Sequence, residues 1–489
     1  MKKYIFYVAA ITSLSIAACR KIETDGEPFI VVQPGGGGGT VTGKTVTLKD
    51  HVTKDTTLLA IDNNIISGKV YVDAGVTLTV EKGATVKGTY AGTSTAALIV
   101  NRGGKLIARG TQEAPIIFTS ASPTPTSGDW GGIELLGKAA INSSNGGAPG
   151  LYIPEGGFSI NNAAKDGYAG SGDALVPAPV NDDSSGVLQY VRIEYAGYAF
   201  LPNQEINALT MACVGSRTVI DHIQVSYAKD DAFEWFGGTV NCKYLIAYKT
   251  QDDDFDTDNG FSGSIQFGLI VRDSAIADVS KSESFESDND GTGGSVLPQT
   301  KAVFCNVSSF GPLATPNNVG NSNYLGAAVQ IRRNSSLSIF NSAFVGWATG
   351  ILIDATSGAH TDLNITAGTL QLSGILLVSC KTPLAYTEAG TSTYSLASLT
   401  TWFTANTKNR ILTQTTEQAI YTRPFDYVSP DWGPFGNSAV VIPTATNTYF
   451  DDPILVARPF ITKVDFIGGI APSGENANWF KGWTKFSNK

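Results

Sequence analysis

A short strand-forming phrase that returns about every twenty residues constrains the fold of this chain more than any other feature. The phrase has three to five β-branched or apolar residues next to glycine, as in VTLTV at 76–80 and ALIV at 97–100, where equivalent residues lie 20 apart. It recurs further along the chain at 191–193, 223–225, 245–247, 269–271, 337–339 and 350–353. A fixed period of this length with short strands indicates a β-solenoid.

The chain is therefore expected to form a right-handed parallel β-helix, in which each coil buries its inward residues against the next coil. A β-sandwich is the alternative, but it is typical of longer alternating strands joined by hairpins. The composition agrees with short strands and turns, because the chain has 53 glycines and 21 prolines and only 16% of its residues are charged. Helix is expected to be a minor component.

A lipoprotein export signal is indicated by the first nineteen residues. Lys2 and Lys3 precede an apolar run, and two alanines stand immediately before Cys19. This order of basic, apolar and small segments is typical of a signal peptide, here over residues 1–18. Cys19 would carry lipid and anchor the mature chain in the bacterial outer membrane, on the cell surface. Basic rather than acidic residues follow it, which favours that membrane; an ordinary secretory peptide with a chance cysteine is the alternative.

The rest of the chain divides into three expected parts. Residues 19–43 contain five consecutive glycines and are expected to form a flexible tether. Residues 44–374 would form the β-helix, with a glycine-, asparagine- and proline-rich loop inserted at 139–185. Residues 375–489, where a short helix is expected near 396–407, would supply the last coils and an aromatic-rich C-terminal cap, since a solenoid needs its open end covered.

Charge limits the partners that the protein is expected to bind. The net charge is −9, and no cluster of lysines and arginines could follow a phosphate backbone, so nucleic acid is not an expected partner. Cations and neutral polymers are favoured instead. The sequence leaves the oligomeric state open.

Cysteine usage is consistent with two arrangements. An oxidising compartment allows one or two disulfides among the cysteines that follow Cys19. Equally, each cysteine could be a small apolar residue of the core. The pairing is not determined by the sequence for Cys213, Cys242, Cys305 and Cys380.

Several longer phrases carry a family resemblance. They include GTQEAPIIFT at 110–119, GDWGGI at 128–133, LQYVRIEYAG at 188–197 and DDAFEWFGG at 230–238. These phrases resemble a group of bacterial surface lipoproteins, of the Bacteroidetes type, that share a right-handed β-helix of the pectate-lyase-like fold. The resemblance extends over nearly the whole chain after the signal. It implies the fold and little about activity, because one fold hosts many functions.

The strongest chemical signal is acidic. Asp231 and Asp254 lie 23 residues apart, about one coil, so successive coils would stack carboxylates on one corner at a strand spacing of about 4.8 Å. Alternating acids near glycine, as in DFDTD and ESDNDG, present oxygens in the way that calcium loops do. We expect a Ca²⁺ site drawn from Asp231, Asp254, Asp256, Asp258, Glu286, Asp288 and Asp290. Plain solvated turns and a catalytic carboxylate set are the alternatives.

Candidate catalytic residues are few. Some lyases of this fold use a lysine base and an arginine acid about one coil apart, and Lys249 and Arg272 have that spacing, although the residues around them do not match. His222, in an Asp-His pair similar to a pectate lyase motif, is expected to be structural. Trp235 and Phe236 could stack on sugar rings beside the acidic corner, and inward packing is the alternative.

These observations favour a lipid-anchored, cell-surface β-helix that binds an extracellular polysaccharide or a partner protein without catalysis. The membrane lipid attached through Cys19 would be its other partner. Two alternatives stay open: a surface polysaccharide lyase or glycoside hydrolase, and an accessory lipoprotein of an outer-membrane uptake or secretion assembly.

Overall fold

A computed structural model describes most of the chain after the predicted tether. The described residues are 29–31, 41–90, 95–158, 164–201, 204–312, 326–390, 393–412, 420–424, 430–434, 440–442 and 448–486. The predicted signal peptide, Cys19 and most of the predicted tether lie outside them.

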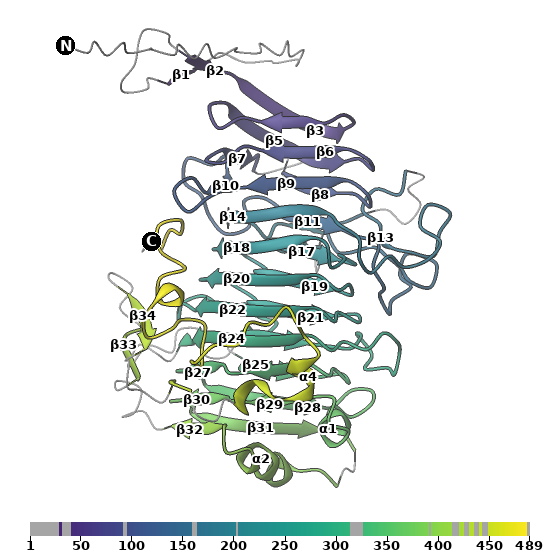
Figure 1. The fold of residues 1–489 in the computed structure, drawn as a ribbon. Helices are drawn as coiled ribbons and strands as arrows, with labels where there is room; N and C mark the ends of the chain where they lie inside the picture. Colours follow the sequence, from purple (N-terminus) through teal and green to yellow (C-terminus); the bar gives the residue numbers. More distant parts are fainter. Residues whose placement is uncertain are drawn as a thin grey trace, which may run out of the picture.

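The strands stack in one continuous parallel array that winds into coils with three faces (Figure 1). Face A contains β4 (Thr56–Leu58), β6 (Thr77–Val80), β9 (Lys105–Arg109), β26 (Ser338–Phe340) and β29 (Leu372–Ser373). Face B contains β7 (Thr85–Gly88), β10 (Ile116–Ser120), β27 (Ala343–Val345), β30 (Leu376–Val378) and β32 (Arg410–Leu412). Five bent strands supply both faces: β14 (Gly186–Glu194), β18 (Val219–Ser226), β20 (Asn241–Tyr248), β22 (Ser264–Val271) and β24 (Val303–Phe310).

Face C is formed by the strands that follow face B in each coil. They are β8 (Ala97–Val100), β11 (Ile133–Leu136), β17 (Leu209–Ala212), β19 (Phe233–Phe236), β21 (Phe255–Asp258), β23 (Phe285–Ser287), β25 (Ala327–Ile331), β28 (Thr349–Ala355) and β31 (Thr382–Glu388). In the first coils, β3 (Thr45–Val52) and β5 (Asn63–Val72) bend from face B to face C. All pairings between neighbouring coils are parallel, as from β19 to β21 and from β21 to β23. The predicted parallel β-helix is confirmed, and the β-sandwich is excluded.

A residue in the left-handed backbone conformation makes the bend between faces A and B. The φ angles of Tyr190, His222, Tyr244 and Phe267 lie between 50° and 65°. These residues occupy the same position on successive coils. The ring centroid of His222 lies 4.3 Å from that of Tyr190 and 4.3 Å from that of Tyr244. Non-glycine residues rarely adopt this conformation, so the stacked rings and the packing around them must hold it. His222 is therefore one member of a structural stack at the bend.

Alternate residues of each strand fill the interior of the coils. In β19 and β21, Phe233, Trp235 and Phe255 point inward and are fully buried, with ring centroids 5.6 to 6.0 Å apart. Complete burial of one such side chain contributes about 1.5–3 kcal/mol. The regular inward aromatic and aliphatic positions explain why the period of the sequence is so clear.

A long insertion and a long C-terminal segment cover two of the faces. Between β11 and β14 the chain leaves the coils and forms the small hairpin of β12 (Leu151–Tyr152) and β13 (Ala169–Gly170). Ile141, Tyr152 and Ala169 of this insertion pack on Leu136 and Phe236 of face C. The hairpin lies beside the coil stack in Figure 1.

The end of the stack is covered by α2 (Leu396–Ala405), which lies below β31 in Figure 1. Its buried Leu399 and Phe403 belong to the same apolar cluster as the coil interior. The structure thus corrects the expectation of an aromatic-rich cap: the helix covers the open end, and the aromatic residues lie elsewhere.

The aromatic C-terminal segment, 448–486, runs back along the side of the stack. It contains η4 (Thr448–Phe450), α4 (Pro453–Val456) and η5 (Glu475–Ala477). Trp479 and Trp483 pack with outward residues of face B, such as Leu269. Gln266 and Gln224 fix its path, because each donates to and accepts from the backbone of the segment. Face B is apolar on its outer side because this segment covers it.

The remaining described elements are short. They are α1 (Asp362–Thr366) and three antiparallel pairs: β1 (Phe29–Val31) with β2 (Val41–Gly43), β15 (Ala199–Leu201) with β16 (Gln204–Glu205), and β33 (Tyr421–Arg423) with β34 (Asp431–Pro434). In the described part of the chain no helix combines the length and the apolar character needed to cross a membrane.

The structure contains no disulfide among the four cysteines of the β-helix. Cys213, Cys242 and Cys305 lie in three different apolar clusters, under the insertion, inside the coils and under the C-terminal segment. This separation explains why they do not pair. The alternative in which cysteine serves as a small core residue is the one that the structure shows.

Candidate functional site

Face C carries a ladder of outward carboxylates on three neighbouring coils. Glu234 of β19 pairs in register with Asp256 of β21, which pairs with Glu286 of β23. The residue before each acid is a phenylalanine that points into the core. Because side chains alternate along a strand, burying the phenylalanines forces the three acids onto the outer face, one strand spacing apart.

A second ladder lies at the turn that leads into face C. The backbone N–H of Asp253 donates to Asp231 Oδ1 at 2.9 Å, and the N–H of Glu283 donates to Asp253 Oδ1 at 2.5 Å. Asn207 begins this ladder, since its Oδ1 accepts from the N–H of Asp231 at 3.2 Å. Each side chain therefore bonds the backbone of the next coil. These bonds fix where the carboxylates stand beside the first ladder.

The two ladders bring carboxylate oxygens together in three overlapping groups. In each group, one oxygen from each residue lies within 4.8 Å of the others. The groups are Asp230, Asp231 and Asp252; then Asp231, Glu234 and Asp256; then Asp253, Asp256 and Glu286. We call the whole set, together with Glu283, the acidic row. Asp231 and Asp256 each belong to two groups, so the row is continuous along the face.

Burial and mutual repulsion raise the pKa of these acids. Burial is the largest cause for Asp256, whose pKa lies well above its ordinary value, and the charge of Glu286 is the next. For Glu286, burial raises the pKa to about 7, although Arg332 opposes the shift. Two charges 4.8 Å apart repel by about 3–4 kcal/mol at an effective dielectric constant of about 20. The row therefore needs protons or a cation to be stable.

One side chain in the row has no bonding partner for its oxygens. Glu283 is 1% exposed, and neither of its carboxylate oxygens accepts a hydrogen bond within the described residues. Burial is the largest cause that raises the pKa of Glu283, and the charge of Glu286 is the next. Asp256 Oδ1 is likewise buried and without a hydrogen-bond donor in the described structure. Buried oxygens of this kind, close to other carboxylates, are suitable ligands for Ca²⁺, which takes six to eight oxygen ligands.

The row opens to solvent through a polar recess of about 330 Å³. We call it the acidic mouth; it is lined by Glu155, Glu205, Lys229, Asp230, Asp252, Asp278 and Ser280. Glu155 belongs to the insertion, which therefore forms one wall. Burial raises the pKa of Glu155 to about 7 and that of Asp252 to about 6.

Arginines close the other end of the row. Arg332 forms an ion pair with Glu286, and its Nε lies 3.0 Å from Asp288 Oδ1. Arg333 Nη1 lies 2.8 Å from the second oxygen of Asp288. The row thus runs from an open acidic mouth to a neutralised end.

The structure places the seven predicted calcium ligands in different surroundings. Asp231, Asp256 and Glu286 lie in the row. Burial raises the pKa of Asp258, and the charge of the neighbouring Asp288 raises it further. Asp288 itself is paired with the two arginines.

Two of the predicted ligands lie elsewhere. Asp290 accepts bonds from the backbone N–H and the hydroxyl of Thr292, so it stabilises a turn. Asp254 is fully buried, with Oδ1 3.3 Å from Arg272 Nη1. It stands outside the row because it faces the other side of the turn.

The predicted catalytic pair is held in structural ion pairs. Arg272 is fully buried, and besides Asp254 it donates to the backbone oxygen of Asp252 at 2.6 Å. Lys249 is 4% exposed, and its Nζ lies 3.0 Å from Asp273 Oδ2. A polymer outside the coils cannot reach Arg272. The two cations hold the turn at the acidic corner together.

The two predicted ring-binding residues are also buried. Trp235 points into the coil interior, and Phe236 is covered by Tyr152 of the insertion, with ring centroids 5.1 Å apart. The expectation that they stack on sugar is therefore corrected. Trp235 packs inward, which was the alternative. Phe236 is covered by the insertion, a segment that is distant from it in the sequence.

Sequence reasoning missed two members of the row, Glu234 and Glu283. One signal could have identified Glu234. A phenylalanine followed by an acid occurs at 233–234, 255–256 and 285–286, and this repeat marks the same place on three coils. No comparable sequence signal marks Glu283, whose position depends on the turn before β23.

Comparison with known proteins supports the fold over most of the chain. A family model described as a pectate-lyase like beta helix domain matches residues 50–422. The matched region includes every coil that contributes to the acidic row. Neither the curated proteins nor the solved structures contain a match.

Proposed function

The chain belongs to the family of pectate-lyase-like β-helix domains, and from that premise we propose that it is a calcium-dependent, non-catalytic module that binds an extracellular polysaccharide. The observation that carries the proposal is the acidic row, where three groups of carboxylate oxygens lie within 4.8 Å of one another. The fold itself is compatible with binding and with catalysis. The residues of the site therefore have to distinguish binding from catalysis.

Calcium would bind to the middle of the row. Asp253, Asp256 and Glu286 offer three oxygens, and the unpartnered carboxylate of Glu283 lies beside them. Bound Ca²⁺ would replace the protons that these acids otherwise need, because it favours their ionised form. Protein carboxylates leave positions on the ion for other oxygens, and the hydroxyl and carboxylate groups of a sugar polymer are ligands of the right class.

The polymer would approach through the acidic mouth. Its volume of about 330 Å³ is sufficient for a small part of a chain, and Lys229 offers one cationic contact among the acids. A polymer of uronic acids would be repelled by the metal-free protein and attracted by the calcium form. Binding is therefore expected to require the ion.

One further observation supports binding over cleavage. Lys249 and Arg272, the pair with lyase-like spacing, are buried in ion pairs and have no path to a polymer on face C. We also propose that Cys19 is lipidated and holds the module at the cell surface. That location would place the acidic mouth in contact with extracellular polymers.

The test is incubation of the full-length protein, purified in detergent, with polygalacturonate, alginate and neutral dextran. Each mixture is prepared with Ca²⁺ or with EDTA and analysed by size-exclusion chromatography. We expect intact acidic polymer to co-elute with the protein in Ca²⁺ only, and we expect Asp256→Asn to abolish co-elution. Asp451→Asn is the matched control, because the Asp451 side chain is 60% exposed.

A second candidate function has one specific observation in its favour. Glu155 and Asp252 line the open mouth, and burial raises their pKa values to about 7 and about 6, a range suited to general acid catalysis. A glycoside hydrolase or lyase would shorten the polymer in the same experiment. Shortened chains would overturn the binding proposal. If the polymer were neither cut nor bound, the binding proposal would also fail, and a protein partner would become the leading hypothesis.

A further inference from the structure

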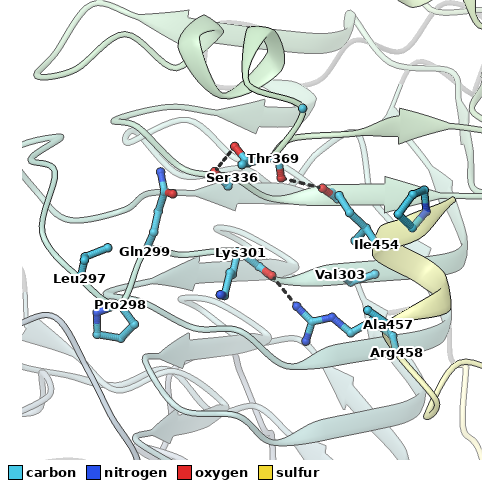
Figure 2. A pocket seen from close by; sticks show the side chains of 13 residues that line it. Leu297, Pro298, Gln299, Lys301, Val303, Ser336, Thr369, Ile454, Ala457 and Arg458 are labelled. Carbon is cyan, nitrogen blue, oxygen red and sulfur yellow. Dashed lines mark hydrogen bonds between the residues drawn. The ribbon is translucent and has the colours of Figure 1, made fainter.

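A second pocket lies on the opposite side of the coils from the acidic row. Its lining is mostly apolar, and its charged residues are cationic. It lies over face A, between α4 of the C-terminal segment and the loop that precedes β24, and its volume is about 630 Å³ (Figure 2). The floor is formed by Val303 of β24 and Ser338 of β26, which point outward from neighbouring coils. The acidic row lies on face C, so the two sites share no residue.

The pocket wall is mostly apolar. Pro298 and Leu297 form one side, and Ile454 and Ala457 of the α4 region form the other. Leu297 is 80% exposed at the rim, where it adds apolar surface that a ligand could cover. Pockets with apolar walls and a few polar groups are typical of sites for small organic molecules.

The charged groups of the pocket are both cationic. Lys301 and Arg458 line it, and no aspartate or glutamate is among its described lining residues. Neither cation forms an ion pair with any described residue. In a protein with a net charge of −9, two cations that lack an ion pair among the described residues give this apolar pocket a local charge complementary to an anion.

Arg458 is fixed in place by the backbone. Its Nη1 donates to the carbonyl oxygen of Ser262 at 2.6 Å, and its Nη2 donates to that of Lys301 at 3.2 Å, as Figure 2 shows for Lys301. A guanidinium has five N–H donors, so others stay available for a ligand. Burial lowers the pKa of Arg458, and no carboxylate of the described residues offsets this cost. An anion in the pocket would offset it.

We propose that this pocket binds a small organic anion with an apolar body, the apolar part lying on Val303, Pro298 and Ile454 and the anionic group near Arg458 and Lys301. The inference is independent of the calcium site. It gives the protein a second ligand, of opposite charge preference to the first, on a face that the insertion does not cover.

The test uses two fluorescent probes that share an apolar body. 1-Anilinonaphthalene-8-sulfonate carries a sulfonate, and N-phenyl-1-naphthylamine does not. With the full-length protein we expect the sulfonate probe to bind at least tenfold more tightly than the neutral probe. Decanoate should displace it, and decanol should not.

Variants of the pocket separate this site from general surface binding. Val303→Trp fills the floor and should abolish probe binding, while Lys301→Gln and Arg458→Gln should each weaken the sulfonate probe about tenfold. Lys463→Gln, with a side chain 61% exposed elsewhere on the segment, is the control. Thermal unfolding of each variant shows whether it is folded. If Arg458→Gln unfolds the segment, Lys301→Gln alone decides the role of charge.

Equal binding of both probes, or unchanged sulfonate binding in the folded Val303→Trp protein, would overturn the proposal. Unchanged binding in the folded Lys301→Gln and Arg458→Gln proteins would overturn the anion preference. Failure of the calcium-dependent polymer binding would leave these results unaffected, because the variants and probes do not touch face C.

Discussion

Asp256 and Glu286 occupy the same outward position on adjacent coils, and together with Asp253 they offer oxygens within 4.8 Å of one another. Both follow a buried phenylalanine, so neither carboxylate can turn away without disturbing the core. Ion binding and stability must therefore be linked at this pair.

Replacing Asp256 by asparagine removes one charge and keeps the shape. We expect Asp256→Asn to bind Ca²⁺ at least tenfold more weakly, as measured by isothermal titration calorimetry. In EDTA the same variant should be more stable than the wild type by about 1–3 kcal/mol, because the repulsion from its neighbours is reduced. Asp451→Asn should change neither quantity. Wild-type calcium affinity in Asp256→Asn would contradict the assignment.

The stability of the metal-free protein should fall as the pH rises from about 4.5 to about 7. Burial raises the pKa of Glu286 to about 7 and that of Asp252 to about 6, above their ordinary values. In this interval the folded chain holds more protons than the unfolded chain, so raising the pH favours unfolding. Saturating Ca²⁺ should reduce this slope, because the ion binds the ionised acids. Urea unfolding at several pH values, with EDTA or with Ca²⁺, measures how the free energy of unfolding changes with pH. A rise in stability with pH in EDTA would refute the prediction.

Arg272 should be required for folding rather than for chemistry. Arg272→Met leaves Asp254 buried without its partner, and we expect a loss of about 3–5 kcal/mol in the free energy of unfolding. The double variant Arg272→Met with Asp254→Asn should recover much of this loss. Lys249→Met should cost less, because its partner Asp273 is partly exposed. A double variant as unstable as Arg272→Met would show that the pair is not the cause.

Gln266 should hold the C-terminal segment against the coils. Its side chain accepts from the backbone N–H of Thr462 at 2.8 Å and donates to the carbonyl of the same residue at 2.7 Å. Gln266→Ala leaves both backbone groups unpaired, at a cost of about 1–3 kcal/mol. Hydrogen exchange should increase over 458–470, with little change in the coils. Gln371→Ala, which loses a single hydrogen bond to Gly368, is the control. Equal hydrogen exchange over 458–470 in the two variants would argue that Gln266 does not hold the segment.

Much of the fold follows from local periodicity. The repeat of apolar phrases near 76–80 and 97–100 predicts parallel coils, because each coil can bury its inward residues only against the next. The same repeat predicts the stacking of acids on one corner. It also places the phenylalanines before Glu234, Asp256 and Glu286 at equivalent positions, and so the outward direction of these acids is encoded locally.

The sequence by itself thus determined the coil, its period and the presence of an acidic corner. Tertiary structure decided which acids meet. Asp254 and Asp256 are two residues apart, yet one pairs with a buried arginine inside the turn and the other joins the acidic row. It also decided that Phe236 is covered by Tyr152 and that the aromatic C-terminal segment lies along face B instead of over the end. These outcomes depend on contacts between segments far apart in the chain, and no local sequence pattern encodes such contacts. The coils, in contrast, make the same contacts with their neighbours at each repeat, so the sequence period encodes them.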